Sequence, residues 1–155
     1  MEFKFYGHAC FSVTLADGKV LLFDPFITGN PLAGSVDADA IRADYILVSH
    51  GHGDHTGDLM AIAKRTGALV ISNAEITDWV KEEGYENVHP MNFGSRQFDF
   101  GMVHYVPATH SSSLPDGSYG GNPGGFIVET GEKTFYYTGD TSLTMEMQLV
   151  PYYAR

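Results

Sequence analysis

The stretch that decides the interpretation of this chain is YILVSHGHGDH, residues 45–55. Its apolar first part, residues 45–48, is typical of a buried strand, and a dense group of histidines with one aspartate follows directly. Imidazole and carboxylate groups are the side chains that bind zinc, manganese, iron or nickel, and the intervening glycines let the backbone turn tightly around an ion. The spacing H-x-H-x-D-H therefore predicts a metal site formed by His50, His52, Asp54 and His55.

The segments around this stretch alternate between strand and helix patterns. Before it, residues 2–6, 10–15 and 19–23 are predicted strands, with turn residues at 16–18. After it, apolar residues at helical spacing predict a helix that ends at Gly67, then a strand at 68–71 and a second helix over 74–83. The sequence therefore indicates an α/β fold in which the metal motif follows a buried strand, at the sheet edge where ligands collect.

The C-terminal part of the sequence has the pattern of β-hairpins and no helix pattern. Two hairpins are predicted, one over residues 97–106 around Gly101 and one over 126–138 around Gly131. Between them lies a loop rich in Ser, Gly and Pro, residues 111–125, which we interpret as a substrate lid.

Two further ligand-type residues follow strand patterns in this part. His110 comes after the apolar pair at 105–106, and Asp140 closes the segment YYTGD at 136–140. Three strand ends would thus each deliver metal-binding side chains, as a site built at one edge of a sheet requires.

Composition narrows the class of function. A net charge of −10 with only nine Lys and Arg residues makes nucleic acid an unlikely partner and favours a small-molecule substrate. No apolar run reaches membrane-spanning length and the N-terminus lacks a signal-peptide pattern, so no membrane association is expected. The one cysteine, Cys10, agrees with a reducing cytoplasm.

The motif residues resemble the signature of the metallo-β-lactamase superfamily, which His50, His52, Asp54 and His55 match in full. The chain also resembles one branch of this superfamily, the small metal-dependent hydrolases that include the ascorbate-6-phosphate lactonase-like proteins. This second resemblance rests on Gly7-His8 and on the segments 24–31 and 137–141. The resemblance covers essentially the whole chain. It implies a single domain over residues 1–155, built as an αβ/βα sandwich with two metals at the sheet edges.

The resemblance also implies a ligand set for two divalent transition metals, zinc first, with manganese, iron or nickel as alternatives. The first metal would be held by His50, His52 and His110, the second by Asp54 and His55, and Asp140 would bridge both. The family's second metal also takes a late histidine, and this sequence has no histidine after His110. We therefore expect a domain truncated at its C-terminus, with the missing part carrying the final ligand.

The implied chemistry is hydrolysis of an ester, lactone, amide or phosphoester bond in a small substrate. Two neighbouring metals bring the pKa of a bridging water to about 7 and polarise the bond under attack. Asp54 is the expected catalytic residue, because it lies beside the water position and would accept the proton.

Three alternatives stay open at this stage. The first is an RNA- or DNA-processing nuclease of the same fold, which the lack of basic clusters disfavours. The second is a di-iron oxidoreductase, although that branch typically replaces a motif histidine with a carboxylate. The third is an inactive fragment that needs a C-terminal partner or a second copy of itself.

Four other residues have two interpretations each. His8 lines the pocket or caps a strand, and Asp24 orients a ligand histidine or starts an Asp-Pro turn. His89 and His104 are expected to be structural or exposed.

Overall fold

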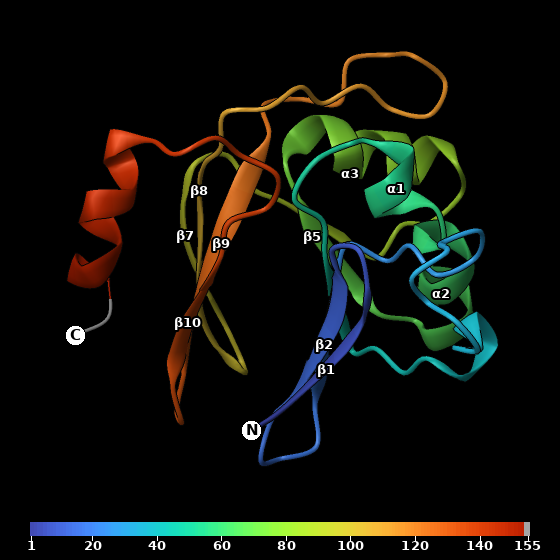
Figure 1. Ribbon diagram of the computed structural model, residues 1–155, viewed down its shortest axis with the longest axis horizontal. Helices are drawn as coiled ribbons and strands as arrows, with labels where there is room; N and C mark the ends of the chain where they lie inside the picture. The colour runs from blue at the N-terminus through green and yellow to red at the C-terminus, as the bar shows by residue number, and fades with distance from the viewer. Residues whose placement is uncertain (154–155) are drawn as a thin grey trace.

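Two β-sheets face each other in the computed structural model, which describes residues 1–153 (Figure 1). The first sheet has the strand order β1-β2-β3-β4-β5-β6, with β1 Glu2–Gly7, β2 Cys10–Thr14, β3 Val20–Phe23, β4 Tyr45–Leu47, β5 Leu69–Ser72 and β6 Val88–Pro90. The second has the order β10-β9-β8-β7, with β7 Gly94–Phe98, β8 Gly101–Pro107, β9 Gly124–Thr130 and β10 Thr134–Tyr137.

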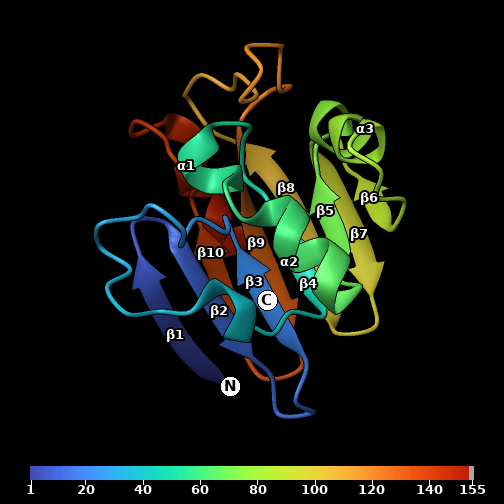
Figure 2. The same ribbon diagram turned by 90° about the vertical axis from the view of Figure 1, so that its right-hand side faces the viewer.

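The helices lie on the outer sides of this pair of sheets. Two of them, α2 Leu59–Thr66 and α3 Ala74–Glu82, cover the outer face of the first sheet, and the single turn α1 Gly53–Thr56 lies at the upper edge of this sheet (Figure 2). A short 3₁₀ helix, η1 Ala38–Ala40, precedes β4, and a longer one, η2 Met145–Tyr152, stands beyond the second sheet at the opposite end of the molecule (Figure 1). Across residues 1–153, no helix combines the length and the apolar character that crossing a bilayer requires.

The central strands of the first sheet, β3 to β5, are buried on both faces, and β3 shows why. Successive side chains of a strand point to opposite faces. Leu21 and Phe23 therefore enter the core between the two sheets, where Phe126 and Val128 of β9 meet them. Leu22 points the other way, into the core beneath α2 and α3. A strand that is covered on both sides needs the continuous apolar run that VLLF supplies.

The pairing of the strands places the functional residues at one edge. Strands β3, β4, β5 and β6 run parallel, so their carboxyl ends lie together. The residues that follow β3 and β4 are Asp24 and the Ser49–His55 motif. In open parallel sheets this edge is the usual place for a ligand site.

The predicted strands and helices are confirmed, with boundaries shifted by a few residues. The two hairpins are β7–β8 and β9–β10. The predictions omitted β6, η1, the single helical turn α1 inside the metal motif, and η2.

Candidate metal centre

The metal motif leaves β4 in an extended conformation and then turns sharply into α1. His50 follows the strand and is completely buried, while His52 precedes the helix and is only partly covered. The backbone N–H of His55 donates to the carbonyl oxygen of His52 at 2.9 Å, which closes the helical turn. This turn brings Asp54 and His55 back toward the same edge of the sheet.

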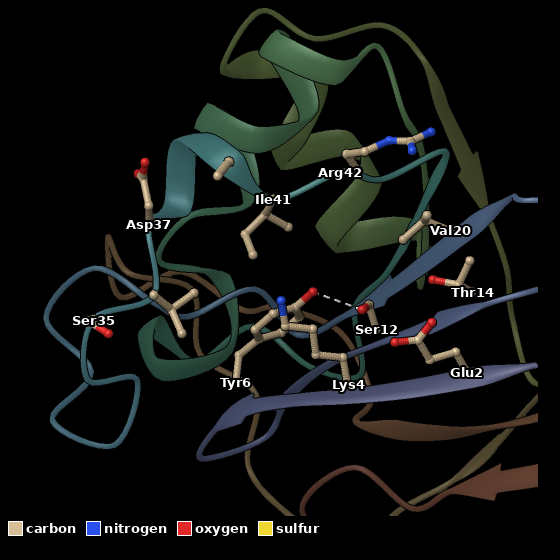
Figure 3. Close-up of a pocket in the computed structure, with 12 residues that line it drawn as sticks. Glu2, Lys4, Tyr6, Ser12, Thr14, Val20, Ser35, Asp37, Ile41 and Arg42 are labelled. Atoms are coloured by element: carbon tan, nitrogen blue, oxygen red, sulfur yellow. Dashed lines mark hydrogen bonds between the residues drawn. The ribbon is translucent and has the colours of Figure 1, made fainter.

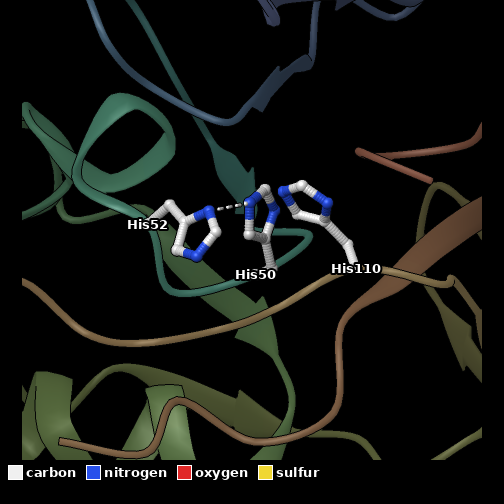
Figure 4. Close-up of side chains that lie close together, drawn as sticks. All are labelled: His50, His52 and His110. Carbon is white, nitrogen blue, oxygen red and sulfur yellow. Dashed lines mark hydrogen bonds between the residues drawn. The ribbon is translucent and has the colours of Figure 1, made fainter. Parts of the chain in front are cut away.

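Three histidines form the first cluster (Figure 4). His50, His52 and His110 each offer one ring nitrogen, and these nitrogens lie within 4.8 Å of one another. His50 Nε2 and His52 Nδ1 are 3.0 Å apart, and the His110 ring centroid lies 5.0 Å from that of His50 and 5.1 Å from that of His52. His110 follows β8 of the second sheet, whereas His50 and His52 follow β4 of the first sheet. The cluster therefore brings together the ends of strands from both sheets.

Asp140 lies between this cluster and the rest of the motif. Its Oδ2 atom is 3.4 Å from His55 Nε2 and 3.6 Å from His110 Nε2. A single carboxylate oxygen therefore approaches both halves of the site, which is the position that a bridging ligand would occupy.

A close backbone approach brings Asp140 to this position. Gly139 has a φ of +60°, and a Cβ atom there would lie 2.5 Å from the carbonyl oxygen of Gly124 and 2.9 Å from Ser49 Cβ. Only glycine fits both the left-handed conformation and this contact. The segment after β10 can therefore press directly against the start of the metal motif.

A buried carboxylate, Asp24, forms hydrogen bonds with residues around the site. Its Oδ1 accepts the backbone N–H of Ser49 at 2.7 Å, and its Oδ2 accepts the Ser49 hydroxyl at 2.5 Å. The same Oδ2 lies 2.7 Å from His55 Nδ1 and accepts the Tyr137 hydroxyl at 2.5 Å. A carboxylate oxygen accepts hydrogen bonds, so the His55 tautomer with its proton on Nδ1 is the one that satisfies this contact.

The orientation of His55 leaves its other nitrogen free for a ligand. His55 is completely buried, and its Nε2 makes no hydrogen bond within residues 1–153. Buried polar atoms are almost always paired, so an unpaired one needs an explanation, and an ion at this atom supplies one. The donor set of imidazoles and carboxylates around it is the set that transition metals select.

The electrostatics of the two buried histidines differ. Burial, together with the positive charge of nearby His55, lowers the pKa of His50 to about 4. His50 is therefore a neutral imidazole near pH 7, the form that binds metals. For His55, burial opposes protonation, but the hydrogen bond and negative charge of Asp24, with the charges of Asp140 and Asp54, raise the pKa. The carboxylates thus make this half of the site favourable for positive charge.

The 111–125 loop is anchored at its base against the motif. The Ser112 hydroxyl accepts the N–H of Gly51 at 3.0 Å and donates to the Gly120 carbonyl at 2.9 Å. Ser112, Leu114 and Gly120 are buried, whereas the tip at 115–119 is exposed. Any lid movement would therefore be confined to the tip.

A separate pocket of about 500 Å³ lies on the outer face of β1–β3 (Figure 3). Tyr6 and Ser12 share a 2.9 Å hydrogen bond at its floor. Lys4 and Asp37 are among its lining residues, so charges of both signs face it, and no residue of the metal clusters described above contributes to it.

Comparison with known proteins identifies the family. The sequence model of the beta-lactamase superfamily domain matches residues 19–152. The chain belongs to the beta-lactamase superfamily. This confirms the resemblance inferred from the motif and the expected fold, and it places the chain in a superfamily that contains metal-dependent hydrolases.

Individual relatives agree with this assignment. A metal-dependent hydrolase from Flavobacterium johnsoniae is 54% identical over 152 residues, which cover 97% of this chain and 67% of that protein. One from Methylacidiphilum infernorum is 54% identical over 150 residues, covering 96% and 66%. The solved structure of a metallo hydrolase from Ignicoccus hospitalis superimposes with a TM-score of 0.81 at 33% identity, covering 95% of this chain and 64% of that one. The chain thus spans about two thirds of the length of these relatives.

The six predicted site residues all lie at this edge: His50, His52, Asp54, His55, His110 and Asp140. The sequence analysis did not anticipate the role of Tyr137, whose hydroxyl reaches from the second sheet to Asp24. Strand alternation could have placed Tyr137 on the inner face of β10, but no spacing rule pairs it with a carboxylate more than a hundred positions away. Ser49 also went unnoticed, although it directly precedes the motif.

Proposed function

We propose that this chain is a metal-dependent hydrolase that uses two divalent transition metals to cleave an ester, lactone or phosphoester bond in a small substrate. The observation that carries the proposal is the pair of ligand clusters at one sheet edge, with Asp140 between them and the buried Nε2 of His55 without a hydrogen bond within residues 1–153. The family of the chain supports the same class of reaction.

The ligands divide into two sets. His50, His52 and His110 would hold the first metal, and Asp54 and His55 the second, with Asp140 shared between them. Zinc suits imidazole nitrogens with carboxylate oxygens, and manganese, iron or nickel are the alternatives. When bound, divalent ions supply Lewis acidity, which polarises a carbonyl or phosphoryl group and lets water ionise near pH 7.

The chain's own residues would orient the ligands and move the proton. Asp24 keeps the proton of His55 on Nδ1, so that Nε2 faces the site. Asp54 has a half-exposed side chain, which lets a carboxylate oxygen reach a water molecule in the site and accept its proton. Burial acts against ionisation of Asp54, but nearby His55 and the backbone lower its pKa overall, so near pH 7 the group is an ionised carboxylate, the form that can bind a metal or accept a proton.

The test is hydrolysis of a panel of esters, lactones and phosphoesters by metal-free chain before and after addition of zinc or manganese. We expect at least one substrate to be cleaved only after metal is added. Asp54→Asn should reduce the rate strongly, whereas His89→Asn, which changes a histidine outside the site, should not. Activity that survives a chelator would contradict the proposal.

The chain also has an open apolar side that we propose is covered by another polypeptide. Phe3 and Phe5 of the edge strand β1 are 63% and 60% exposed. Phe3, with Phe11 and Phe135, lines an apolar groove of about 380 Å³ between β1–β2 and β10. A complementary fragment or a second copy of the chain would bury these rings, and the native mass of the purified protein distinguishes the two.

We further propose that the protein works in the cytoplasm. Its one cysteine, Cys10, is completely buried and unpaired, as is usual in a reducing compartment.

A further inference from the structure

We propose that His8 is a ligand of the second metal, which would be held by His8, Asp54 and His55 together with Asp140. This inference rests on the proposed function, since it concerns one half of the same centre. It adds a residue from β1–β2 that the metal motif does not contain.

The geometry brings His8 into ligand distance of the motif. His8, Asp54 and His55 each offer one ligand atom, and these atoms lie within 4.8 Å of one another. His8 Nε2 is 3.2 Å from Asp54 Oδ2, and the ring centroids of His8 and His55 are 5.1 Å apart. His8 comes from the β1–β2 turn and Asp54 and His55 from α1, and the three side chains converge on one point, as the donors of a metal site do.

The backbone at His8 is held in an unusual conformation that aims its ring at this point. His8 lies in the tight turn between β1 and β2 and has a φ of +55°. Gly7 before it has a φ of +112°, and a Cβ atom there would lie 2.8 Å from the backbone of Leu32. Non-glycine residues keep a left-handed backbone only where the surroundings enforce it, and such positions cluster at functional sites. The edge of the His8 ring also packs on Phe26, with centroids 6.0 Å apart.

The charges around His8 favour a cation rather than a simple ion pair. Asp54 and Asp140 place carboxylates on this half of the site, and His55 Nε2 is completely buried without a hydrogen bond in the described part of the chain. A contact between His8 and Asp54 alone would leave that nitrogen unpaired. A divalent ion bound by these four side chains would coordinate His55 Nε2 and neutralise the charge of the two carboxylates. Neutral imidazole and carboxylate are both good ligands for such an ion.

The test is titration of the metal-free chain with Co²⁺, followed by calorimetry and by the visible absorption of the bound ion. The variant is His8→Asn, because asparagine also tolerates a left-handed backbone but is a much weaker ligand than imidazole. The matched control is His89→Asn, a histidine in β6 outside both clusters. Thermal unfolding of each metal-free variant checks that the fold is retained.

We expect two Co²⁺ equivalents for the unaltered chain and for His89→Asn. In His8→Asn the first equivalent should bind normally and the second more than about 100-fold more weakly, with an altered spectrum, since even loss of a group that merely supports a ligand weakens binding roughly 10- to 100-fold.

Three results would overturn the inference. Two normal equivalents in His8→Asn, or equal weakening of both, would remove His8 from the ligand set and leave the proposed function intact. Only one equivalent in the unaltered chain would show that the second site does not form. No Co²⁺ bound by the unaltered chain would overturn the proposed function as well.

Discussion

Replacing Asp24 with asparagine is expected to disable His55 as a metal ligand while preserving the fold. Asp24 is completely buried and has a φ of +41°, a conformation that asparagine also adopts. Its Oδ2 meets three groups: the Ser49 hydroxyl, His55 Nδ1 and the Tyr137 hydroxyl. In the variant, an NH₂ group that donates two hydrogen bonds takes the place of this acceptor.

The expected losses of stability and of metal affinity depend on how these three groups can rearrange their hydrogen bonds. The two hydroxyls can rotate and accept from the new NH₂ group, but His55 Nδ1 can accept only if its proton moves to Nε2. The net loss is therefore about one hydrogen bond to a charged acceptor, roughly 1.5–3 kcal/mol of unfolding free energy. A proton on His55 Nε2 also occupies the atom that would bind metal, and loss of such a supporting carboxylate weakens metal binding by about 10- to 100-fold.

Three measurements on Asp24→Asn test this reasoning. Urea unfolding of the metal-free chain gives the stability change, calorimetric zinc titration gives the affinity, and ¹⁵N NMR of the imidazoles identifies the protonated nitrogen of His55. Asp58→Asn is the matched control, because Asp58 is also buried and accepts the N–H groups of Ile27 and Thr28 at 2.6 and 2.8 Å without touching a histidine. The control should lose stability but bind zinc normally. Unchanged zinc affinity in Asp24→Asn, with the proton still on Nδ1, would refute the reasoning.

Three further predictions follow from the core and the site. Phe23→Ala should lower the unfolding free energy by about 3–5 kcal/mol in urea titration, because the ring is completely buried and stacks on Phe11; a loss below about 1 kcal/mol would contradict the described core. Cys10 should not react with a thiol reagent at pH 8 until the chain is unfolded, because burial raises its pKa to about 12; rapid reaction of the native chain would be inconsistent with this. Asp140→Ala should reduce the bound metal in elemental analysis, since its Oδ2 approaches both clusters, and an unchanged metal content would exclude Asp140 as a ligand.

The sequence was sufficient for the parts of the fold that depend on local pattern. The run Tyr45–Val48 predicted β4, and residues after it with helical spacing predicted α2, which ends at Gly67 as expected. The motif itself predicted which side chains gather after β4. In each case the information lies within a short segment, where side-chain periodicity and turn residues determine the structure.

The remaining features depend on contacts between distant segments. The bond from Tyr137 to Asp24 joins two sheets, and the turn that aims His8 at Asp54 depends on packing against Leu32. His104 was expected to be structural or exposed; it is buried and structural, in hydrogen-bond contact with Ser95 and Glu129 on neighbouring strands, partners that its own segment does not reveal. The short strand β6 carries little apolar pattern of its own and forms because β5 offers it a parallel edge.

The most direct test of the central claim is the metal content of the purified chain after incubation with zinc and removal of the excess, measured by elemental analysis alongside the native mass. The account predicts two zinc ions per chain, with the mass showing whether another polypeptide accompanies it. A chain that is folded and retains no zinc would contradict the claim that these histidines and carboxylates form a metal centre.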